Sequence, residues 1–283
     1  MKFARLGERG AEIPVVQQDG RSFDLRSVTE RIDGEFLASG GIGRARHAFN
    51  QGRLPELEGA EELRIGAPID IPTKIVCVGL NYRDHAAETG AAEPIEPVVF
   101  MKDPLTIVGP FDDVFIPRGS VKTDWEVELG VVIGEQARYL PDPAASADVI
   151  AGYVLSHDVS EREFQLERGG QWDKGKSCET FNPLGPVFVT SDSIADPQEL
   201  RMRTTVNGVL RQNGSSATMI FDVNFLIWYL SQFMVLRPGD LVNTGTPAGV
   251  ALGLADHPYL RNGDVVELEI EQLGVARQRM VQA

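Results

Sequence analysis

The chain is poor in cysteine, and its two cysteines stand far apart. Cys77 and Cys178 are the only thiols among 283 residues, and no Cys-x-x-Cys pair occurs. Disulfide-framed secreted domains carry many more cysteines, and thiolate zinc sites need them in close pairs. The sequence therefore excludes both kinds of scaffold and predicts a protein of a reducing compartment.

Positive charge is also scarce. The chain carries 27 Lys and Arg against 41 Asp and Glu, which gives a formal net charge of -14. A surface this acidic repels nucleic acid and anionic membrane surfaces, so neither is expected as a partner. A small anionic substrate would need local positive charge in order to bind.

Long apolar runs are missing as well. No segment approaches the roughly 20 apolar residues that cross a bilayer. The start of the chain lacks the basic and then apolar pattern of a secretory signal. The expectation is a cytoplasmic protein, and its 42% hydrophobic residues are sufficient for a packed core.

A change of composition near residue 70 predicts two units, a small N-terminal α+β domain over 1–70 and a catalytic domain over 71–283. In the first, strands are expected at 1–6 and 12–18, helices at 28–39 and 44–51, and a glycine linker at 40–43. In the second, many short strands accompany a hairpin turn at Asn207-Gly208 and one long amphipathic helix over 222–235, capped by Asp222. This pattern predicts an α+β fold that is mostly β.

Two glutamates alternate in the segment 123–134, which is predicted to form one strand. Side chains two apart share a face of a strand, so Glu126 and Glu128 point the same way, and Trp125 and Val127 point the other way. Neighbouring carboxylates repel each other. Water, a pair of Arg or Lys residues, or a divalent cation must offset their charge.

A third carboxylate, Asp158, lies near the end of a strand predicted over 151–159. Three hard oxygen ligands favour Mg²⁺ or Mn²⁺, with Ca²⁺ as a further candidate, over Zn²⁺ or Cu²⁺. A helix predicted to begin at Ser160 places Arg162 and Gln165 on one face. Arg162 and Lys176 are the cations available to an anionic substrate.

Two further segments carry candidate chemistry. His85 and Glu88 are three residues apart on a short helix predicted within 81–90, so they share a face. A carboxylate beside an imidazole orients it and raises its basicity, which suits a general base, while a surface ion pair is the alternative. The loop 243–249, which contains Gly245 and Thr246, presents backbone N–H groups and a hydroxyl to a ligand anion.

Five motifs occur in an order that resembles the fumarylacetoacetate hydrolase family. They are Val-Gly-Leu-Asn-Tyr-Arg-Asp-His at 78–85, Glu-Val-Glu at 126–128, His-Asp-Val-Ser at 157–160 with Arg162, Gly-Lys-Ser at 175–177 and Asn-Thr-Gly-Thr-Pro at 243–247. The resemblance covers nearly everything from residue 71 onward. Within that family, residues 122–130 and 174–181 look most like the 2,4-diketo-3-deoxy-L-fuconate hydrolases and, after them, the ureidoglycolate lyases.

The resemblance implies a mixed β-roll fold, a homodimer, and Mg²⁺ or Mn²⁺ bound by Glu126, Glu128 and Asp158. It implies that His85 and Glu88 form a water-activating dyad on a lid that orders over the substrate. It also implies that Lys176 binds substrate oxygens. The substrate-binding residues around Lys176 would be Arg162, Gln165, Gly245 and Thr246.

The resulting hypothesis is a hydrolase that cleaves the C3–C4 bond of a 2,4-diketo acid and releases pyruvate. The acid would be an acylpyruvate or a 2,4-diketo-3-deoxy sugar acid. An oxaloacetate decarboxylase or a ureidoglycolate lyase-type enzyme with the same metal site is the first alternative, and a non-catalytic, metal-stabilised binding protein is the second. Specificity is expected to come from the lid, residues 82–95, and from loops near Gln171, Arg211 and Tyr259.

Overall fold

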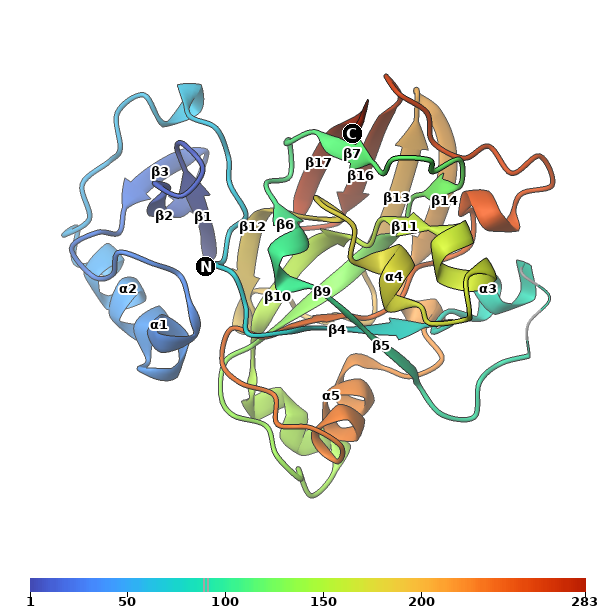
Figure 1. Ribbon diagram of the computed structural model, residues 1–283. Coiled ribbons are helices and arrows are strands. Elements are labelled where there is room, and N and C mark those ends of the chain that lie inside the picture. Colours follow the sequence, from blue (N-terminus) through green and yellow to red (C-terminus); the bar gives the residue numbers. More distant parts are fainter. Residues whose placement is uncertain (89, 91) are drawn as a thin grey trace.

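A curved sheet of ten strands forms the centre of the molecule in a computed structural model that describes residues 1–88, 90 and 92–283 (Figure 1). Its path runs β3-β2-β1-β12-β10-β9-β15-β4-β5, and β6 pairs with β12. The bounds are β1 (Lys2–Leu6), β2 (Ile13–Gln18), β3 (Arg21–Asp24), β4 (Ile75–Gly79), β5 (Val98–Lys102), β6 (Ile107–Val108), β9 (Val127–Ile133), β10 (Ile150–His157), β12 (Asn182–Thr190) and β15 (Leu241–Asn243).

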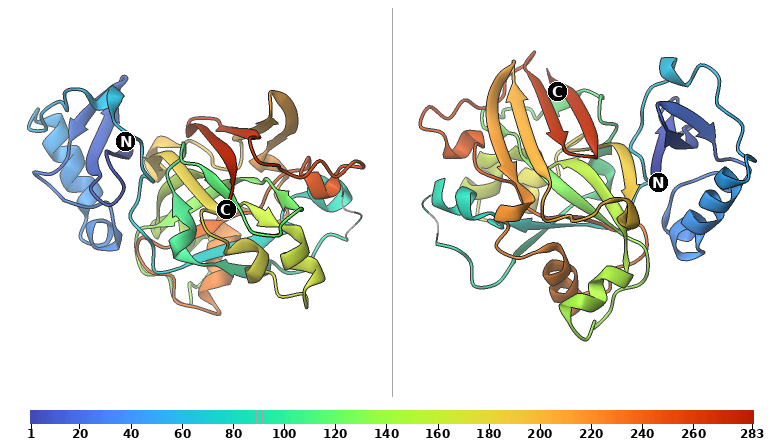
Figure 2. Two further views of the ribbon diagram at one scale, coloured as in Figure 1. Left: turned by 45° about the horizontal axis from the view of Figure 1, so that its top comes forward. Right: turned by 180° about the vertical axis from the view of Figure 1, so that it is seen from behind.

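A second sheet of five strands stands against one face of the first, as the view from behind shows (Figure 2). Its order is β14-β13-β16-β17-β7, with β7 (Val114–Ile116), β13 (Arg201–Val206), β14 (Val209–Ser215), β16 (Val265–Ile270) and β17 (Gly274–Gln282). The two strands β13 and β14 meet at Asn207 and Gly208, which both have positive φ, so the predicted hairpin is confirmed.

Alternation along β9 explains why both of its faces are covered. Val127, Leu129 and Val131 belong to one buried cluster together with residues of the five-stranded sheet. Val132 points the other way, into a second cluster that includes residues of the N-terminal segment. Every residue of β9 is therefore buried, as expected of a strand packed on both faces. The predicted fold class, mostly β with a mixed β-roll, is confirmed.

The N-terminal segment extends the main sheet. Strand β1 pairs with β12 through Lys2↔Val189 and Phe3↔Phe188, and β2 and β3 continue the sheet outward. Both predicted helices differ in extent: α1 is Gly34–Ala38, capped by Asp33, and α2 is Gly41–Asn50. The glycines at 41–43 thus begin a helix instead of forming a linker, because left-handed Gly40 serves as its N-cap. The domain boundary at residue 70 stays a prediction.

The remaining helices are short. They are α3 (Arg83–Glu88), α4 (Asp173–Lys176), α5 (Val223–Ser231), a π-helix at Glu163–Glu167, and 3₁₀ turns at Ala60–Glu62, Pro104–Thr106, Pro143–Asp148, Ser191–Ser193, Ser216–Thr218 and Ala251–Gly253. In the described chain, each helix falls short of the length and apolarity that a bilayer crossing needs. Residues 89 and 91 of the predicted lid lie outside the described residues.

Two predicted strands, 123–134 and 151–159, are each followed or interrupted by a break at neighbouring residues, and two predictions are therefore wrong. The segment 123–134 is not one strand: Thr123–Asp124 (β8) pairs with Ser160–Glu161 (β11), whereas β9 pairs with β10. No helix begins at Ser160, because pairing with Asp124 keeps that residue extended. Between the two pairs, the Asp158 N–H donates to the Glu126 carbonyl at 3.0 Å. The breaks therefore bring Glu126 and Asp158 side by side.

Helix α5 supplies a test of local sequence control. The Asp222 carboxylate accepts a hydrogen bond from the Phe225 N–H at 2.7 Å, as an N-cap should. We expect Asp222→Ala to lower the free energy of unfolding by about 1 kcal/mol, because the amide loses its acceptor. Asp222→Asn keeps an acceptor and should stay near the parent value. Denaturant unfolding measures both, and equal losses in the two variants would contradict the capping role.

Candidate metal centre and its pocket

Three carboxylates meet where the paired strands break. Glu126, Glu128 and Asp158 each offer an oxygen, and these oxygens lie within 4.8 Å of one another. All three side chains are buried. Glu128 lies within β9, Glu126 directly precedes β9, and Asp158 directly follows β10. The predicted cluster therefore comes from two paired strands.

Lysines hold two of these carboxylates in place. The Lys176 ammonium donates to Glu126 Oε2 at 2.7 Å and to Asp158 Oδ2 at 2.9 Å. On its other oxygen, Asp158 is paired with the ammonium of Lys102, which also donates to the Val159 carbonyl at 3.1 Å. Both lysines are buried, so each must be paired to remain charged there.

An arginine fixes Glu126 from the other side. Arg162 Nη2 donates to Glu126 Oε1 at 2.7 Å, and Arg162 Nε donates to Asp124 Oδ2 at 2.8 Å. Its Nη1 donates to Gln165 Oε1 at 3.0 Å, which confirms that Arg162 and Gln165 share a face. The guanidinium is thus a clamp between two carboxylates and an amide.

Glu128 differs from its two neighbours. Among the described residues it forms no ion pair, and its Oε2 accepts a hydrogen bond from the Gly245 N–H at 2.8 Å. Burial, together with the charges of Asp158 and Glu126, raises the pKa of Glu128 well above its usual value. Burial would also raise the pKa of Glu126, but Lys176 and Arg162 outweigh it and lower that pKa. Glu128 is the carboxylate that still needs a cation.

The charge balance of the centre points the same way. Asp124, Glu126, Glu128 and Asp158 contribute four negative charges, and Lys102, Arg162 and Lys176 contribute three positive ones. A divalent cation changes the sum from -1 to +1. All three cluster ligands are hard oxygens, so the donor set fits Mg²⁺ or Mn²⁺, and the positive sum suits an anionic substrate.

The glycine-rich loop after β15 is shaped to reach Glu128. Gly245 has φ +99, and a Cβ there would lie 2.9 Å from the Cβ of Asn81, so a larger residue would clash and be strained. The Thr246 hydroxyl donates to the Val127 carbonyl at 2.9 Å and accepts from Gln212 Nε2 at 2.8 Å. These bonds hold the loop against β9.

The imidazole and carboxylate predicted on α3 do lie together. His85 Nδ1 stands 3.5 Å from Glu88 Oε2, and the Gly249 N–H donates to both Glu88 oxygens at 2.9 and 3.0 Å. Helix α3 follows β4 directly, and Figure 1 shows it on the same side of the body as α4, which carries Lys176. His85 of this pair shares a pocket with Glu126 and Glu128.

This pocket has a volume of about 220 Å³. Its polar lining comprises His85, Glu126, Glu128, Arg162, Gln165, Lys176, Gly245 and Thr246, and its apolar lining comprises Val78, Gly79, Leu80, Phe100, Leu166, Trp172 and Leu252. Of the ten site residues that the sequence predicted, Glu88 and Asp158 do not line the pocket. They instead contact His85 and Lys176, which do.

Sequence reasoning missed several residues of the centre. Asp124 continues the alternation of Glu126 and Glu128 two residues upstream, so the spacing alone could have identified it. Lys102 ends strand β5, and a lysine at a strand end looks locally like an exposed residue, so its burial beside Asp158 carries no local signal. Gln212 and Trp172 likewise carry no local signal, because only the tertiary fold brings them to the site.

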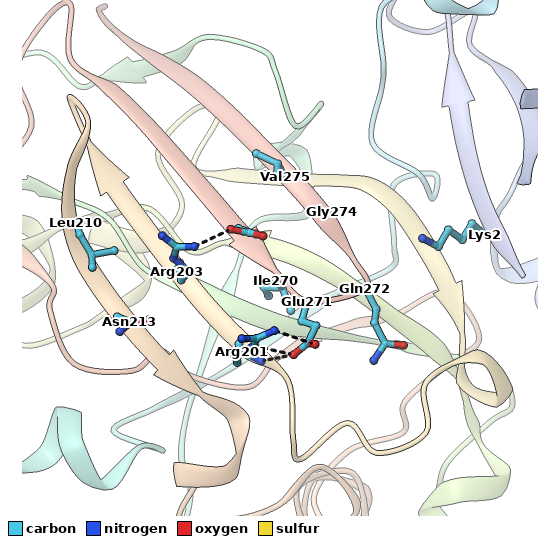
Figure 3. Close-up of a pocket in the computed structure, with 11 residues that line it drawn as sticks. Lys2, Arg201, Arg203, Leu210, Asn213, Ile270, Glu271, Gln272, Gly274 and Val275 are labelled. Atoms are coloured by element: carbon cyan, nitrogen blue, oxygen red, sulfur yellow. Dashed lines mark hydrogen bonds and ion pairs between the residues drawn. The ribbon is translucent and has the colours of Figure 1, made fainter. Parts of the chain in front are cut away.

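A larger hollow elsewhere has a different character. It has a volume of about 550 Å³ and lies on the outer face of the five-stranded sheet (Figure 3). Arg201 pairs with Glu271 at 3.2 Å and Arg203 with Glu269 at 3.6 Å. Both arginines of this hollow are therefore paired with carboxylates, Lys2 is its third positive side chain, and the metal centre lies elsewhere.

Comparison with known proteins places the chain among enzymes. A model of the fumarylacetoacetate (FAA) hydrolase C-terminal family matches residues 74–281. A protein of Burkholderia multivorans is 50% identical over 276 residues, 97% of this chain and 96% of its own length. That protein is named as a hydrolase on a provisional basis, and its name gives no substrate.

Solved structures agree over the whole chain. The fumarylacetoacetate hydrolase of Exiguobacterium antarcticum is 34% identical with a TM-score of 0.87, and 100% of each chain is covered. The maleylpyruvate hydrolase of Sphingobium sp. SYK-6, solved with manganese(II) and pyruvate, is 26% identical with a TM-score of 0.81 and the same coverage. A 2-hydroxyhepta-2,4-diene-1,7-dioate isomerase of Mycobacterium marinum is 30% identical with a TM-score of 0.76, covering 100% of this chain and 98% of its own.

Metal binding is expected to depend on Glu128. With Mg²⁺ or Mn²⁺ at about 100 times Kd, the ion adds roughly 2.7 kcal/mol of stability, so Tm should rise by about 5 °C or more. Glu128→Gln should abolish that rise. It should barely change the metal-free Tm, because Glu128 forms no ion pair among the described residues and a Gln side chain keeps the oxygen that accepts the hydrogen bond from the Gly245 N–H. Thermal scans with EDTA and with metal measure both.

Glu135→Gln is the matched control, since Glu135 is exposed on the same segment. It should keep the full metal-dependent rise. An unchanged rise in Glu128→Gln would show that the ion binds elsewhere.

Lys102 is expected to matter for stability without metal. Lys102→Met leaves one oxygen of buried Asp158 without its cation, and breaking a buried pair in this way costs about 3–5 kcal/mol. Lys122→Met removes an ion pair with Glu167 near the surface and should have little effect. Urea unfolding in EDTA compares the two, and equal small losses would contradict a role of Lys102 in holding Asp158.

Proposed function

Because the chain belongs to the fumarylacetoacetate hydrolase family, we propose that it cleaves the C3–C4 bond of a 2,4-diketo acid and releases pyruvate. The observation that carries this proposal is that His85, which has Glu88 beside it, lines the same pocket as Glu126 and Glu128 of the carboxylate cluster. A metal site alone serves many reactions. A base that lines the same pocket suits a reaction that activates water.

The three clustered carboxylates would hold Mg²⁺ or Mn²⁺. When bound, the ion supplies Lewis-acid stabilisation of the negative charge that develops on the keto acid during bond cleavage. Asp124 and Arg162 keep Glu126 in place, Lys102 keeps Asp158 in place, and Gly245 orients Glu128. These contacts fix the ligand oxygens before any substrate arrives.

His85 is proposed as the general base. Its Nδ1 lies 3.5 Å from Glu88 Oε2, and its Nε2 would take a proton from the water that attacks the C4 carbonyl. Glu88 fixes the ring and stabilises the imidazolium that results. Glu88 is itself held by two bonds from the Gly249 N–H, which ties the dyad to the glycine-rich loop.

Lys176 is proposed to bind the substrate oxygens. Burial alone would lower its pKa, but Asp158 and Glu126 raise it, so the ammonium stays charged. An ammonium fixed beside the reacting atoms stabilises developing oxyanion charge. Gln165 accepts from Arg162 through Oε1, which orients the amide so that its NH₂ group is available to the substrate. Backbone N–H groups around Thr246 complete the anion-binding side.

Two alternatives keep the same centre. Oxaloacetate decarboxylation, like a ureidoglycolate lyase-type or isomerase reaction, needs no water-activating base at C4. A non-catalytic binding protein needs neither the dyad nor the charged Lys176. The contact of His85 with Glu88, and the place of His85 in the lining of the pocket that holds Glu126 and Glu128, support hydrolysis. The homodimer and the cytoplasmic location stay predictions.

The test is a pyruvate-release screen over a panel of 2,4-diketo acids with Mg²⁺ or Mn²⁺. We expect turnover that EDTA abolishes. In His85→Ala, kcat should fall about 10²- to 10⁴-fold, because general-base catalysis contributes roughly that factor. His47→Ala changes an exposed histidine on α2 and should keep the parent rate.

Each outcome assigns a different function. Full hydrolysis by His85→Ala would contradict the dyad. Loss of hydrolysis with retained oxaloacetate decarboxylation would separate the two activities within one centre. If no diketo acid turns over while metal still raises Tm, the chain is a metal-stabilised binding protein.

A further inference from the structure

The pocket has two chemically different halves. Its charged half is the carboxylate cluster with Lys176 and Arg162, where the carboxylate and C2 oxygen of a 2,4-diketo acid would lie. The other half is lined by apolar side chains, namely Leu80, Phe100, Leu166, Trp172 and Leu252. The acyl group beyond C4 has to occupy whatever space the charged half leaves.

An aromatic wall begins beside the charged half. The Lys176 ammonium lies 5.0 Å from the centroid of the Phe100 ring. The Phe100 and Trp172 rings are 5.4 Å apart with an interplanar angle of 59°. The two rings, which contact each other, therefore form an aromatic surface that begins beside the lysine.

The indole of Trp172 is held in place by a close approach to the backbone. A Cβ on Gly79 would lie only 2.5 Å from Trp172 Cζ3 and 3.1 Å from Cη2. The indole therefore occupies space that exists because residue 79 has no side chain. A ring fixed in this way offers a preformed surface and loses little conformational freedom when a ligand binds.

Among the described residues, the side chains of the apolar half, Leu80, Phe100, Leu166, Trp172 and Leu252, offer few hydrogen-bonding groups to a ligand. The two cations that line the pocket, Arg162 and Lys176, both already bind carboxylates of the protein. In the part of the chain that the structure describes, the other ionisable side chains that line the pocket are Glu126, Glu128 and His85. A hydroxyl or a second carboxylate on the acyl group would lose water there without gaining a partner.

We infer that Trp172 and Phe100 are specificity-determining residues that select 2,4-diketo acids with a small apolar acyl group. This inference rests on the proposed function. A pocket of about 220 Å³ limits the acyl group to a short alkyl chain or a single ring. Sugar-derived acids with several hydroxyls, and diketo acids with a carboxylate at each end, are disfavoured.

The first experiment compares kcat/KM for matched substrates with Mg²⁺ present. They are 2,4-dioxopentanoate, 4-phenyl-2,4-dioxobutanoate, 2,4-dioxohexanedioate and 5,6-dihydroxy-2,4-dioxohexanoate. The parent protein should favour the two apolar acids by at least about tenfold over the other two, because an unpaired polar group costs binding that an apolar group gains.

Trp172→Ala should lower kcat/KM for the phenyl substrate about tenfold, mainly through KM, and change the dihydroxy substrate by less than about threefold. Trp172→Phe keeps an aromatic face and should retain most of the preference. Trp228→Ala is the matched control, because Trp228 lies on α5 and does not line the pocket. An equal preference for all four acids, or a Trp172→Ala variant with unchanged ratios, would overturn the inference.

A second readout needs no turnover. Phenylpyruvate and pyruvate are keto acids that differ by one ring, and calorimetry with Mn²⁺ gives their Kd values. The parent protein should bind phenylpyruvate at least about fivefold more tightly, and Trp172→Ala should remove that difference. If phenylpyruvate binds more tightly and Trp172→Ala removes that preference, but no diketo acid turns over, the proposed reaction is wrong while the role of Trp172 in binding apolar groups is supported. Equal binding of both acids by the parent protein would contradict the role of Trp172 and Phe100 in binding an apolar group.

Discussion

Mutual repulsion among buried carboxylates is the constraint on which this structure depends. Asp124, Glu126, Glu128 and Asp158 are all buried, and three paired cations balance all but one of their charges. A buried charge without a partner costs on the order of several kcal/mol of lost hydration. The remaining negative charge, which falls on Glu128, makes the centre suitable for one divalent ion.

The sheet provides the rigidity that this arrangement requires. Strand β9 is packed on both faces, so Glu128 is carried by one of the most enclosed elements in the molecule. The change of pairing from β10 to β11 happens where Asp158 and Glu126 share a backbone hydrogen bond. Because both breaks occur together, the ligands come from backbone that is already fixed. The glycine-rich loop then adds Gly245 to the centre and connects it to the dyad through Gly249.

Much of the centre could be predicted from local sequence, since alternation and helical spacing are local properties. Glu126 and Glu128 followed from the two-residue period, and Arg162 with Gln165 followed from a three-residue spacing that the observed hydrogen bond confirms. The break at Trp125 could not be predicted, because it reflects a change of partner strand. Ser160 has the local appearance of a helix cap, yet its pairing with Asp124 overrides that preference. Lys102 and Trp172 reach the site only through the fold, since their partners Asp158 and Gly79 are distant in sequence.

The central claim is that three carboxylates close around one hard dication. Anomalous scattering from a crystal grown with Mn²⁺ tests it most directly, because the signal locates the ion independently of the protein atoms. The account predicts one strong peak bounded by oxygens of Glu126, Glu128 and Asp158, with Lys176 moved off at least one of them. A map without a peak there, in which Lys176 and Arg162 still bridge the carboxylates, would contradict it.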